Sequence, residues 1–151
     1  MMNRSALLAS TALGLALCTI TPAAAAPPAD VMETVTSCGN SGLQAGLATR
    51  VCAEITGTTV TFYGKAGLAG PPSPGSPQPG VKELLTTLSV EVVGAAPPQT
   101  QVKPLLFAGA TLEVRAPAVT APCGSTVRGT FGVAAFPRAA NPVVHEVTLG
   151  C

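Results

Sequence analysis

The only histidine of the chain, His145, is followed directly by Glu146. A His-Glu pair opens the H-E-x-x-H motif of zinc proteases, in which two histidines on one helical face bind the metal. Here Leu149 stands where the second histidine would be, and the surrounding V-V-H-E-V-T-L favours a strand. Neighbouring side chains of a strand point to opposite faces, so His145 and Glu146 cannot act on one bound group. We expect His145 to share a face with Val143, Val147 and Leu149 as a partly buried structural residue.

The other residue types needed for hydrolysis are poorly placed. A serine triad requires an acid, and the only aspartate, Asp30, lies close to the amino end, while no G-x-S-x-G motif is present. Paired carboxylates for glycoside hydrolysis are compatible with the spacing of the internal glutamates, yet on alternating strands these look like solvated faces. The glutamates are Glu54, Glu83, Glu91, Glu113 and Glu146. We therefore predict that the protein is not an enzyme and has no cofactor, no metal and no catalytic residue.

Cys18 lies in the apolar amino-terminal segment, which we assign to a leader. The four remaining cysteines are Cys38, Cys52, Cys123 and Cys151. They lack C-x-x-C spacing and the single histidine has no ligand-like pattern, so structural disulfides are favoured over a metal or redox site. Of the three connectivities we predict Cys38 with Cys52 and Cys123 with Cys151, because each pair flanks successive strands that would run antiparallel. Each bridge should stabilise the fold by about 3 to 4 kcal/mol.

The amino-terminal segment has the pattern of a secretory signal peptide. A short start with one positive charge precedes an uncharged run of small and apolar residues at 5–20, and Ala23-Ala24-Ala25 offers an A-x-A cleavage site. We expect cleavage after Ala25, so that residues 1–25 are the leader and the mature, secreted chain is 26–151. No later apolar run is long enough to span a membrane.

A second export route stays open at Cys18. The stretch Leu15-Ala16-Leu17-Cys18 loosely resembles the lipobox of bacterial lipoproteins, in which the cysteine becomes the lipidated first residue. Leu17 departs from that pattern, because the family has a small residue directly before the cysteine. The signal peptide is therefore the favoured interpretation of this segment.

Composition excludes several classes of partner. Without Arg4 of the leader, seven basic residues balance seven acidic ones, and the chain has no tryptophan and only 3% aromatic residues. A neutral surface gives no electrostatic footprint for nucleic acid or anionic lipid. Few rings are available to stack on bases or sugars.

Alternating apolar residues and Gly/Pro turns predict about seven strands. The range 81–93 also fits a helical stripe, but its threonines and valines favour a strand. The range 102–115 is either one bent strand or two short ones around Gly109. The expected strands are 31–37, 49–56, 58–68, 81–93, 102–115, 125–136 and 142–149.

The longest break in this pattern is Ala69 to Gly80, A-G-P-P-S-P-G-S-P-Q-P-G, which contains five prolines and three glycines. Such a segment can neither form a helix nor donate regularly to a sheet, so we predict a semi-rigid surface loop.

Short strands without a helix predict an all-β, immunoglobulin-like Greek-key sandwich of about seven strands, stapled by two disulfides and forming one domain over 26–151. The tryptophan and tyrosine corner of immunoglobulin domains are not evident, so this is an architecture and not a family. Architecture does not imply function.

We expect a small secreted, non-enzymatic interaction or accessory module whose loop at 69–80 contacts an unknown protein or the cell envelope. The alternative is a secreted inhibitor of an extracellular hydrolase, either a protease or an amylase. It resembles the proteinaceous inhibitors of those enzymes only in size, export and number of bridges, and no inhibitory motif is matched.

Overall fold

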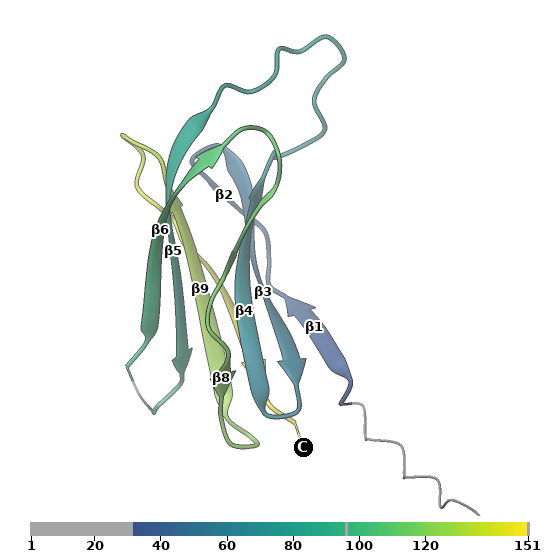
Figure 1. Cartoon of the computed structure of the whole chain (residues 1–151), viewed down its shortest axis with the longest axis vertical. Coiled ribbons are helices and arrows are strands. Elements are labelled where there is room, and N and C mark those ends of the chain that lie inside the picture. Colours follow the sequence, from purple (N-terminus) through teal and green to yellow (C-terminus); the bar gives the residue numbers. More distant parts are fainter. Residues whose placement is uncertain (1–31, 96, 151) are drawn as a thin grey trace, which may run out of the picture. The chain divides into compact units, whose positions relative to one another are not determined.

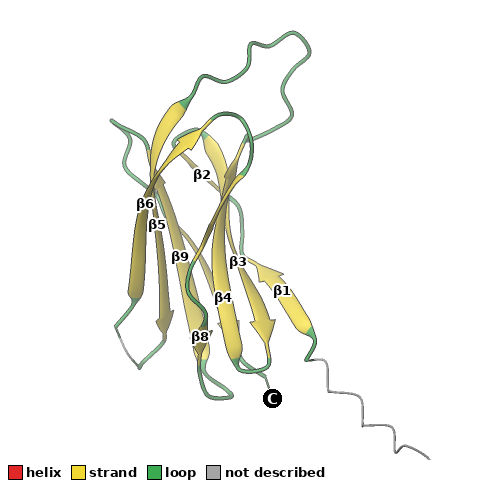
Figure 2. Cartoon of the chain, viewed as in Figure 1, coloured by secondary structure: helices red, strands yellow, loops and turns green. Residues whose placement is uncertain are grey.

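The computed structural model describes residues 32–95 and 97–150, and this part of the chain folds into ten β-strands without a helix. The strands form two antiparallel sheets whose inner faces enclose one hydrophobic core (Figures 1 and 2). The predicted all-β fold is confirmed. The predicted leader at 1–25, with Cys18, lies outside the described residues.

The first sheet, called sheet A, has the strand order β1-β3-β4-β7, with β2 also paired to β3 and β8 also paired to β4. Its strands are β1 (Thr34–Cys38), β2 (Gly42–Gln44), β3 (Leu47–Thr56), β4 (Thr59–Gly67), β7 (Leu112–Arg115) and β8 (Val119–Thr120). The second, sheet B, has the order β10-β9-β5-β6. Its strands are β5 (Lys82–Val92), β6 (Gln99–Phe107), β9 (Thr126–Ala134) and β10 (Val143–Thr148).

The long strands that were predicted are present, whereas two short strands of the structure were not predicted. The range 81–93 is a strand, as its β-branched residues indicated, and 102–115 is two strands that belong to different sheets. The chain crosses between them at Gly109, which has φ 95°, a conformation that glycine adopts most readily. β2 and β8 lie between the predicted strands and were not predicted, because strands of two or three residues are too short to show a period. β6 also begins three residues earlier than expected, so the turn before it is shorter.

Two of the three buried phenylalanines of the core each lie against a glycine of the opposite sheet. Phe62 of β4 faces Gly129 of β9, where an added Cβ would come within 2.2 Å of the ring. Phe131 of β9 faces Gly64 of β4 in the same way, also at 2.2 Å. The two pairs are reciprocal, since each strand supplies one ring and one glycine two residues apart. Each ring thus occupies the space that a side chain would take up on the opposite strand.

A buried amide fills a gap in the ladder of sheet B. β10 pairs with β9 only as far as Phe131, so the backbone of β9 beyond that residue lacks a neighbouring strand on this side. The side chain of Gln44, in β2, lies there. Its Oε1 accepts from the Val133 N–H at 2.9 Å, and its Nε2 donates to the Phe131 carbonyl at 3.1 Å and to Thr49 Oγ1 at 2.8 Å. Gln44 thus takes over the hydrogen bonds of a missing stretch of strand.

One of the two predicted disulfides is confirmed. Cys38 of β1 and Cys52 of β3 are directly opposite each other in the antiparallel ladder and are bonded, with their Cα atoms 4.0 Å apart. Four of the five residues of β1 are exposed, so this edge strand is held by its ladder and by the bridge more than by burial. The predicted pairing of Cys123 with Cys151 stays a prediction, because Cys151 lies outside the described residues.

Candidate functional site

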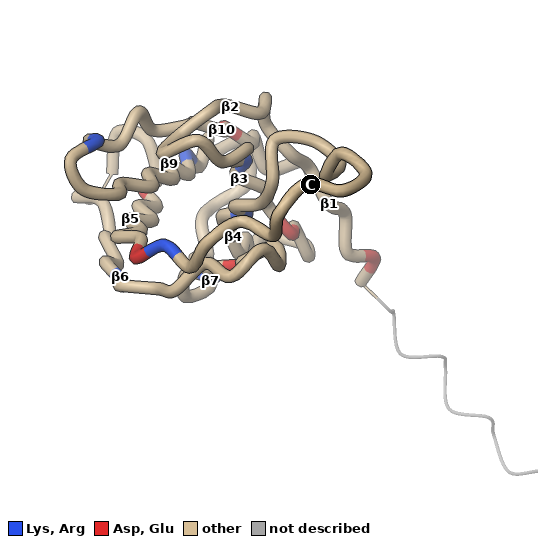
Figure 3. The backbone as a smooth tube through the Cα atoms, turned by 90° about the horizontal axis from the view of Figure 1, so that it is seen from above, with Lys and Arg blue, Asp and Glu red and all other residues tan. Residues whose placement is uncertain are grey.

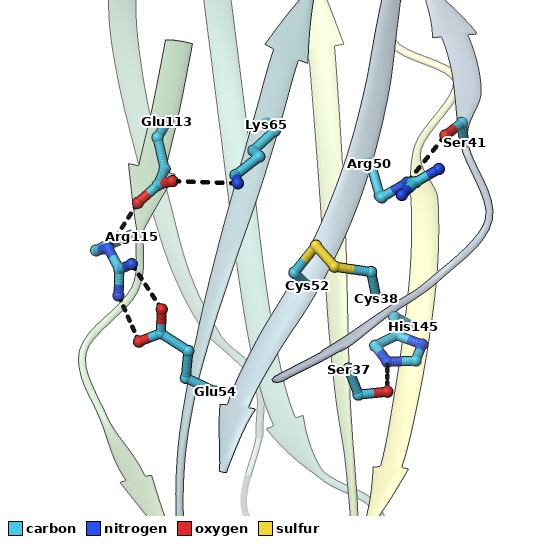
Figure 4. Close-up of a disulfide and its surroundings, with 10 residues drawn as sticks. All are labelled: Ser37, Cys38, Ser41, Arg50, Cys52, Glu54, Lys65, Glu113, Arg115 and His145. Atoms are coloured by element: carbon cyan, nitrogen blue, oxygen red, sulfur yellow. Dashed lines mark hydrogen bonds and ion pairs between the residues drawn. A yellow bond between two sulfur atoms is a disulfide. The ribbon is translucent and has the colours of Figure 1, made fainter. Parts of the chain in front are cut away.

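His145 lies at the seam where the edge of sheet B meets the edge of sheet A. Its Nε2 is 2.9 Å from Oγ of Ser37 in β1, and its ring meets Phe62 edge-on at 6.5 Å between centroids (Figure 4). On the same face of β10, Val147 is buried, whereas Glu146 is exposed on the other face. Partial burial lowers the pKa of His145 below its usual value near 6.5.

A Ser-His hydrogen bond is half of a nucleophilic triad, which also needs an acid behind the histidine and donors for an oxyanion. Among residues 32–95 and 97–150, no carboxylate is hydrogen-bonded to His145. Burial lowers the pKa of His145 and so favours the neutral ring. The hydrogen bond between Ser37 and His145 links β1 of sheet A to β10 of sheet B.

Arginine side chains bind four of the five internal glutamates. On the outer face of sheet A, Arg115 makes a two-pronged contact with Glu54, at 2.8 Å for each bond, and a third bond to Glu113 at 2.7 Å (Figure 4). The hydrogen bond from Arg115 lowers the pKa of Glu54, which favours its ionised form. Nζ of Lys65 lies 3.8 Å from Oε2 of Glu113, at the edge of the same cluster.

A second cluster lies on the outer face of sheet B. There Arg128 is bonded to both Glu91 and Glu146, each at 2.6 Å. A general acid for glycoside hydrolysis must present its carboxyl group to the glycosidic oxygen, whereas both of these carboxyl groups accept hydrogen bonds from one guanidinium group. Charged residues are spread around the strands and not gathered into one patch (Figure 3). Within the described residues no group of three His, Cys, Asp or Glu side chains could hold a metal ion.

The loop at 69–80 is exposed over its whole length and joins β4 in sheet A to β5 in sheet B (Figure 1). Its one backbone bond is a turn at the tip, where Ser76 N donates to the Ser73 carbonyl at 3.0 Å. Nothing lies within 4 Å of the Cβ positions at Gly70, Gly75 and Gly80. The loop is therefore exposed throughout, and near its end Pro79 comes within 3.6 Å of the Cβ position of Gly109 in the turn between β6 and β7.

An apolar groove of about 670 Å³ lies at the same end of the molecule, on the outer face of sheet B. The β5–β6 hairpin forms one wall with Leu85, Pro104 and Leu106, and the turn Ala135–Arg138 forms the other. Phe136 lies at the tip of that turn and its side chain is fully exposed. The sequence-based prediction missed this groove.

A signal for the groove was nevertheless present. In a strand with one buried face, two successive leucines cannot both point inward. Leu84 is buried while Leu85 is half exposed, and on β6 Leu105 points inward while Leu106 is 62% exposed. The two Leu-Leu pairs are cross-strand neighbours, which places both outward leucines on one patch.

On the other side of the Ala135–Arg138 turn is a second, more polar hollow of about 450 Å³, lined by Ala45, Lys82, Glu83 and Arg138. Within the described part of the chain, no ion pair joins Lys82, Glu83 or Arg138 to another side chain. The charges beside the groove therefore differ from the paired charges farther along both sheets.

Comparisons of the chain with models of protein families, with curated proteins and with solved structures found no match. The described residues contain no helix of the length and apolar character needed to cross a membrane.

Proposed function

We propose that this protein is a small secreted, non-enzymatic interaction module that binds a partner through the loop at 69–80. The observation that carries the proposal is the complete exposure of this loop on a rigid two-sheet base. Loops of this length without secondary structure are uncommon in compact domains and usually have a function.

Stiffness makes the loop suited to binding. Five prolines restrict the backbone before any contact is made, and the turn from Ser73 to Ser76 fixes the tip. A preorganised segment loses less conformational entropy when it binds, so more of the contact energy appears as affinity. Both ends of the loop continue into strands, which limits its motion at the base.

The non-enzymatic part of the proposal rests on the side chains that could react. Four of the internal glutamates are bound to arginines, and His145 is hydrogen-bonded to Ser37 without a carboxylate behind it in the described residues. These contacts stabilise the sandwich, and they engage the groups that acid-base catalysis would otherwise use.

Export and the finer architecture belong to the same proposal. A disulfide on an edge strand suits an oxidising compartment. Gly124 N donates to the Leu149 carbonyl at 2.8 Å, and Leu149 N donates to the Ser125 carbonyl at 3.0 Å, so the residues that follow Cys123 lie beside Leu149. This supports the second bridge, Cys123 with Cys151, in an immunoglobulin-like Greek-key sandwich.

The test replaces residues 69–80 by a Gly/Ser segment of equal length in the mature chain, 26–151. Immobilised wild-type and loop-replaced proteins are exposed to culture supernatant and envelope fractions, and captured proteins are compared. We expect a protein that binds the wild type and is lost on loop replacement, while thermal unfolding of both proteins is the same. Capture that is absent, or that survives loop replacement, would contradict the proposal.

The inhibitor alternative is favoured by the fixed turn at the loop tip, because a stiff loop can occupy an active site without reacting. Adding the wild-type protein to a panel of secreted proteases and amylases tests it. Inhibition that disappears on loop replacement would identify the partner as a hydrolase. Turnover of a substrate by the wild type that His145→Ala abolishes would instead show that the protein is an enzyme.

A further inference from the structure

The apolar groove on sheet B is lined by several large hydrophobic side chains that are exposed to solvent. Leu85 is 49% exposed, Leu106 is 62% exposed and Phe136 is fully exposed, and all three line the same groove. Val102 is also half exposed and lies on the same face of β6 as Leu106. A contiguous patch of this type is typical of an interaction surface.

The occupant must approach the face of the sheet and not its edge. β6 is the outer strand of sheet B, and an extended peptide could in principle pair with it. Pro104 lies in the middle of β6 and has no N–H to donate, and Lys103 adds a charge beside it. Both features are typical of edge strands that resist the addition of another strand.

The surface around the groove combines an apolar hollow with a projecting side chain that fits such a hollow. Phe136 is a projecting aromatic side chain, and the groove that it borders is an apolar hollow large enough for such a ring. Glu83 and Arg138 have opposite charges, both border the groove, and neither forms an ion pair within the described residues. An interface between two identical copies needs such a self-complementary surface, because a two-fold axis brings each feature of one copy to the other.

We propose that two copies of this chain associate through the outer face of sheet B. Phe136 of each copy enters the groove of the other, against Leu85 and Leu106. Glu83 of each copy faces Arg138 of the second copy, so two ion pairs flank the aromatic contacts. The proposal goes beyond the binding role of the loop at 69–80, and it implies that a dimer presents two such loops, which would strengthen binding to a partner with repeated sites.

Sedimentation equilibrium of the mature chain over a wide range of concentrations tests the association. We expect a monomer–dimer equilibrium, and Phe136→Ser should weaken it by about thirtyfold or more, as expected for a central aromatic contact. The matched control is Leu43→Ser in β2 of sheet A, because Leu43 is exposed to a similar extent as Leu106 and does not line the groove. This control should leave the association constant unchanged.

Mixing two charge variants tests the two-fold arrangement directly. Glu83→Arg brings two guanidinium groups together at each contact, and Arg138→Glu brings two carboxylates together, so each variant alone should be monomeric. A mixed pair restores opposite charges at both contacts, so combining the two variants should give dimers. Thermal unfolding of each variant shows whether it is folded.

A wild-type chain that is monomeric at every concentration would overturn the proposal, and the groove would then belong to a different partner. Dimers that tolerate Phe136→Ser, or charge variants that stay monomeric when mixed, would overturn the proposed interface. The loop-replaced protein separates the two proposals, because it should dimerise like the wild type even if it no longer captures a partner.

Discussion

The phenylalanines of the core and the phenylalanine beside the groove lie in opposite surroundings. Phe62 and Phe131 are both fully buried, and each ring lies against a glycine of the opposite sheet. Phe136 follows β9 by two residues and is fully exposed at the tip of a turn. The interior rings have complementary sites within the chain, and the exterior ring has none in the described residues. The difference shows that the first two rings are part of the hydrophobic core and that the third is not.

The charged residues show the same division. Arg115 and Arg128 each bind two glutamates on the outer faces of the sheets, whereas Glu83 and Arg138 beside the groove have no such partner among the described residues. Exposed ion pairs contribute little to stability individually, but they leave few charges free for another molecule. Lys82, Glu83 and Arg138, which form no ion pair within the described residues, border the two hollows beside the exposed apolar surface.

Replacing one buried and one exposed phenylalanine by alanine should give the largest difference in the free energy of unfolding. Phe131→Ala should lower the free energy of unfolding by about 3 to 5 kcal/mol, because it leaves a cavity over Gly64. Phe136→Ala should change it by less than about 0.5 kcal/mol in dilute solution, where the chain would be monomeric. Denaturant unfolding followed by circular dichroism measures both values. Equal losses in the two variants would show that Phe136 has a structural role.

Adding a side chain at one of these glycines tests the same packing by crowding the ring instead of leaving a cavity. Gly129→Ala should cost about 3 kcal/mol, because its Cβ would overlap the Phe62 ring between two rigid sheets. Gly132→Ala on the same strand is the control: its Cβ would meet Ala140 at 3.3 Å and Pro142 at 3.5 Å, and the loss should stay below about 1 kcal/mol. Phe62→Leu should recover part of the stability of Gly129→Ala. If the two alanine variants unfold at the same denaturant concentration, the glycines are not essential to the packing.

Replacing each of two glutamines by leucine should give an intermediate difference in the free energy of unfolding. Gln44→Leu should lower the free energy of unfolding by about 2 kcal/mol, since it leaves the Val133 N–H and the Phe131 carbonyl without partners. Gln101→Leu should be neutral or slightly stabilising, because the Nε2 of Gln101 is buried without a hydrogen-bond partner. Chemical unfolding of both variants is the measurement. A stable Gln44→Leu protein would mean that water replaces the amide.

The pH dependence of stability should show the smallest effect. Burial lowers the pKa of His145 in the folded state, so the unfolded state binds more protons and stability falls as pH drops below the usual histidine value of about 6.5. His145 is only partly buried, so the loss should be no more than about 0.5 kcal/mol. Comparing wild type with His145→Gln between about pH 8 and about pH 5 isolates it. A wild type that gains stability relative to the variant on acidification would contradict the assigned direction.

Local patterns predicted the parts of the fold that depend on local sequence. Alternation placed the long strands, and the flanking positions of Cys38 and Cys52 gave the correct pairing. Proline content placed the loop at 69–80, because proline acts on the backbone directly.

Features that depend on distant segments could not be obtained in this way. The glycines opposite Phe62 and Phe131, the amide of Gln44 beside β9 and the bond between Ser37 and His145 each join residues far apart in the chain. Their positions follow from how the two sheets pack, which a single sequence does not reveal. The groove is an intermediate case, since the paired leucines of β5 and β6 indicated outward apolar residues without indicating the turn that faces them.

The amide of Gln44 has a consequence for how this surface can vary. Because a side chain from β2 satisfies the peptide groups at the end of β9, the segment joining β9 to β10 need not continue the sheet. Insertions or substitutions between Phe136 and Pro142 would then leave the Val133 N–H and the Phe131 carbonyl paired as before. Changes of length and sequence in this segment would therefore alter the surface beside the groove while the sandwich beneath it stays the same.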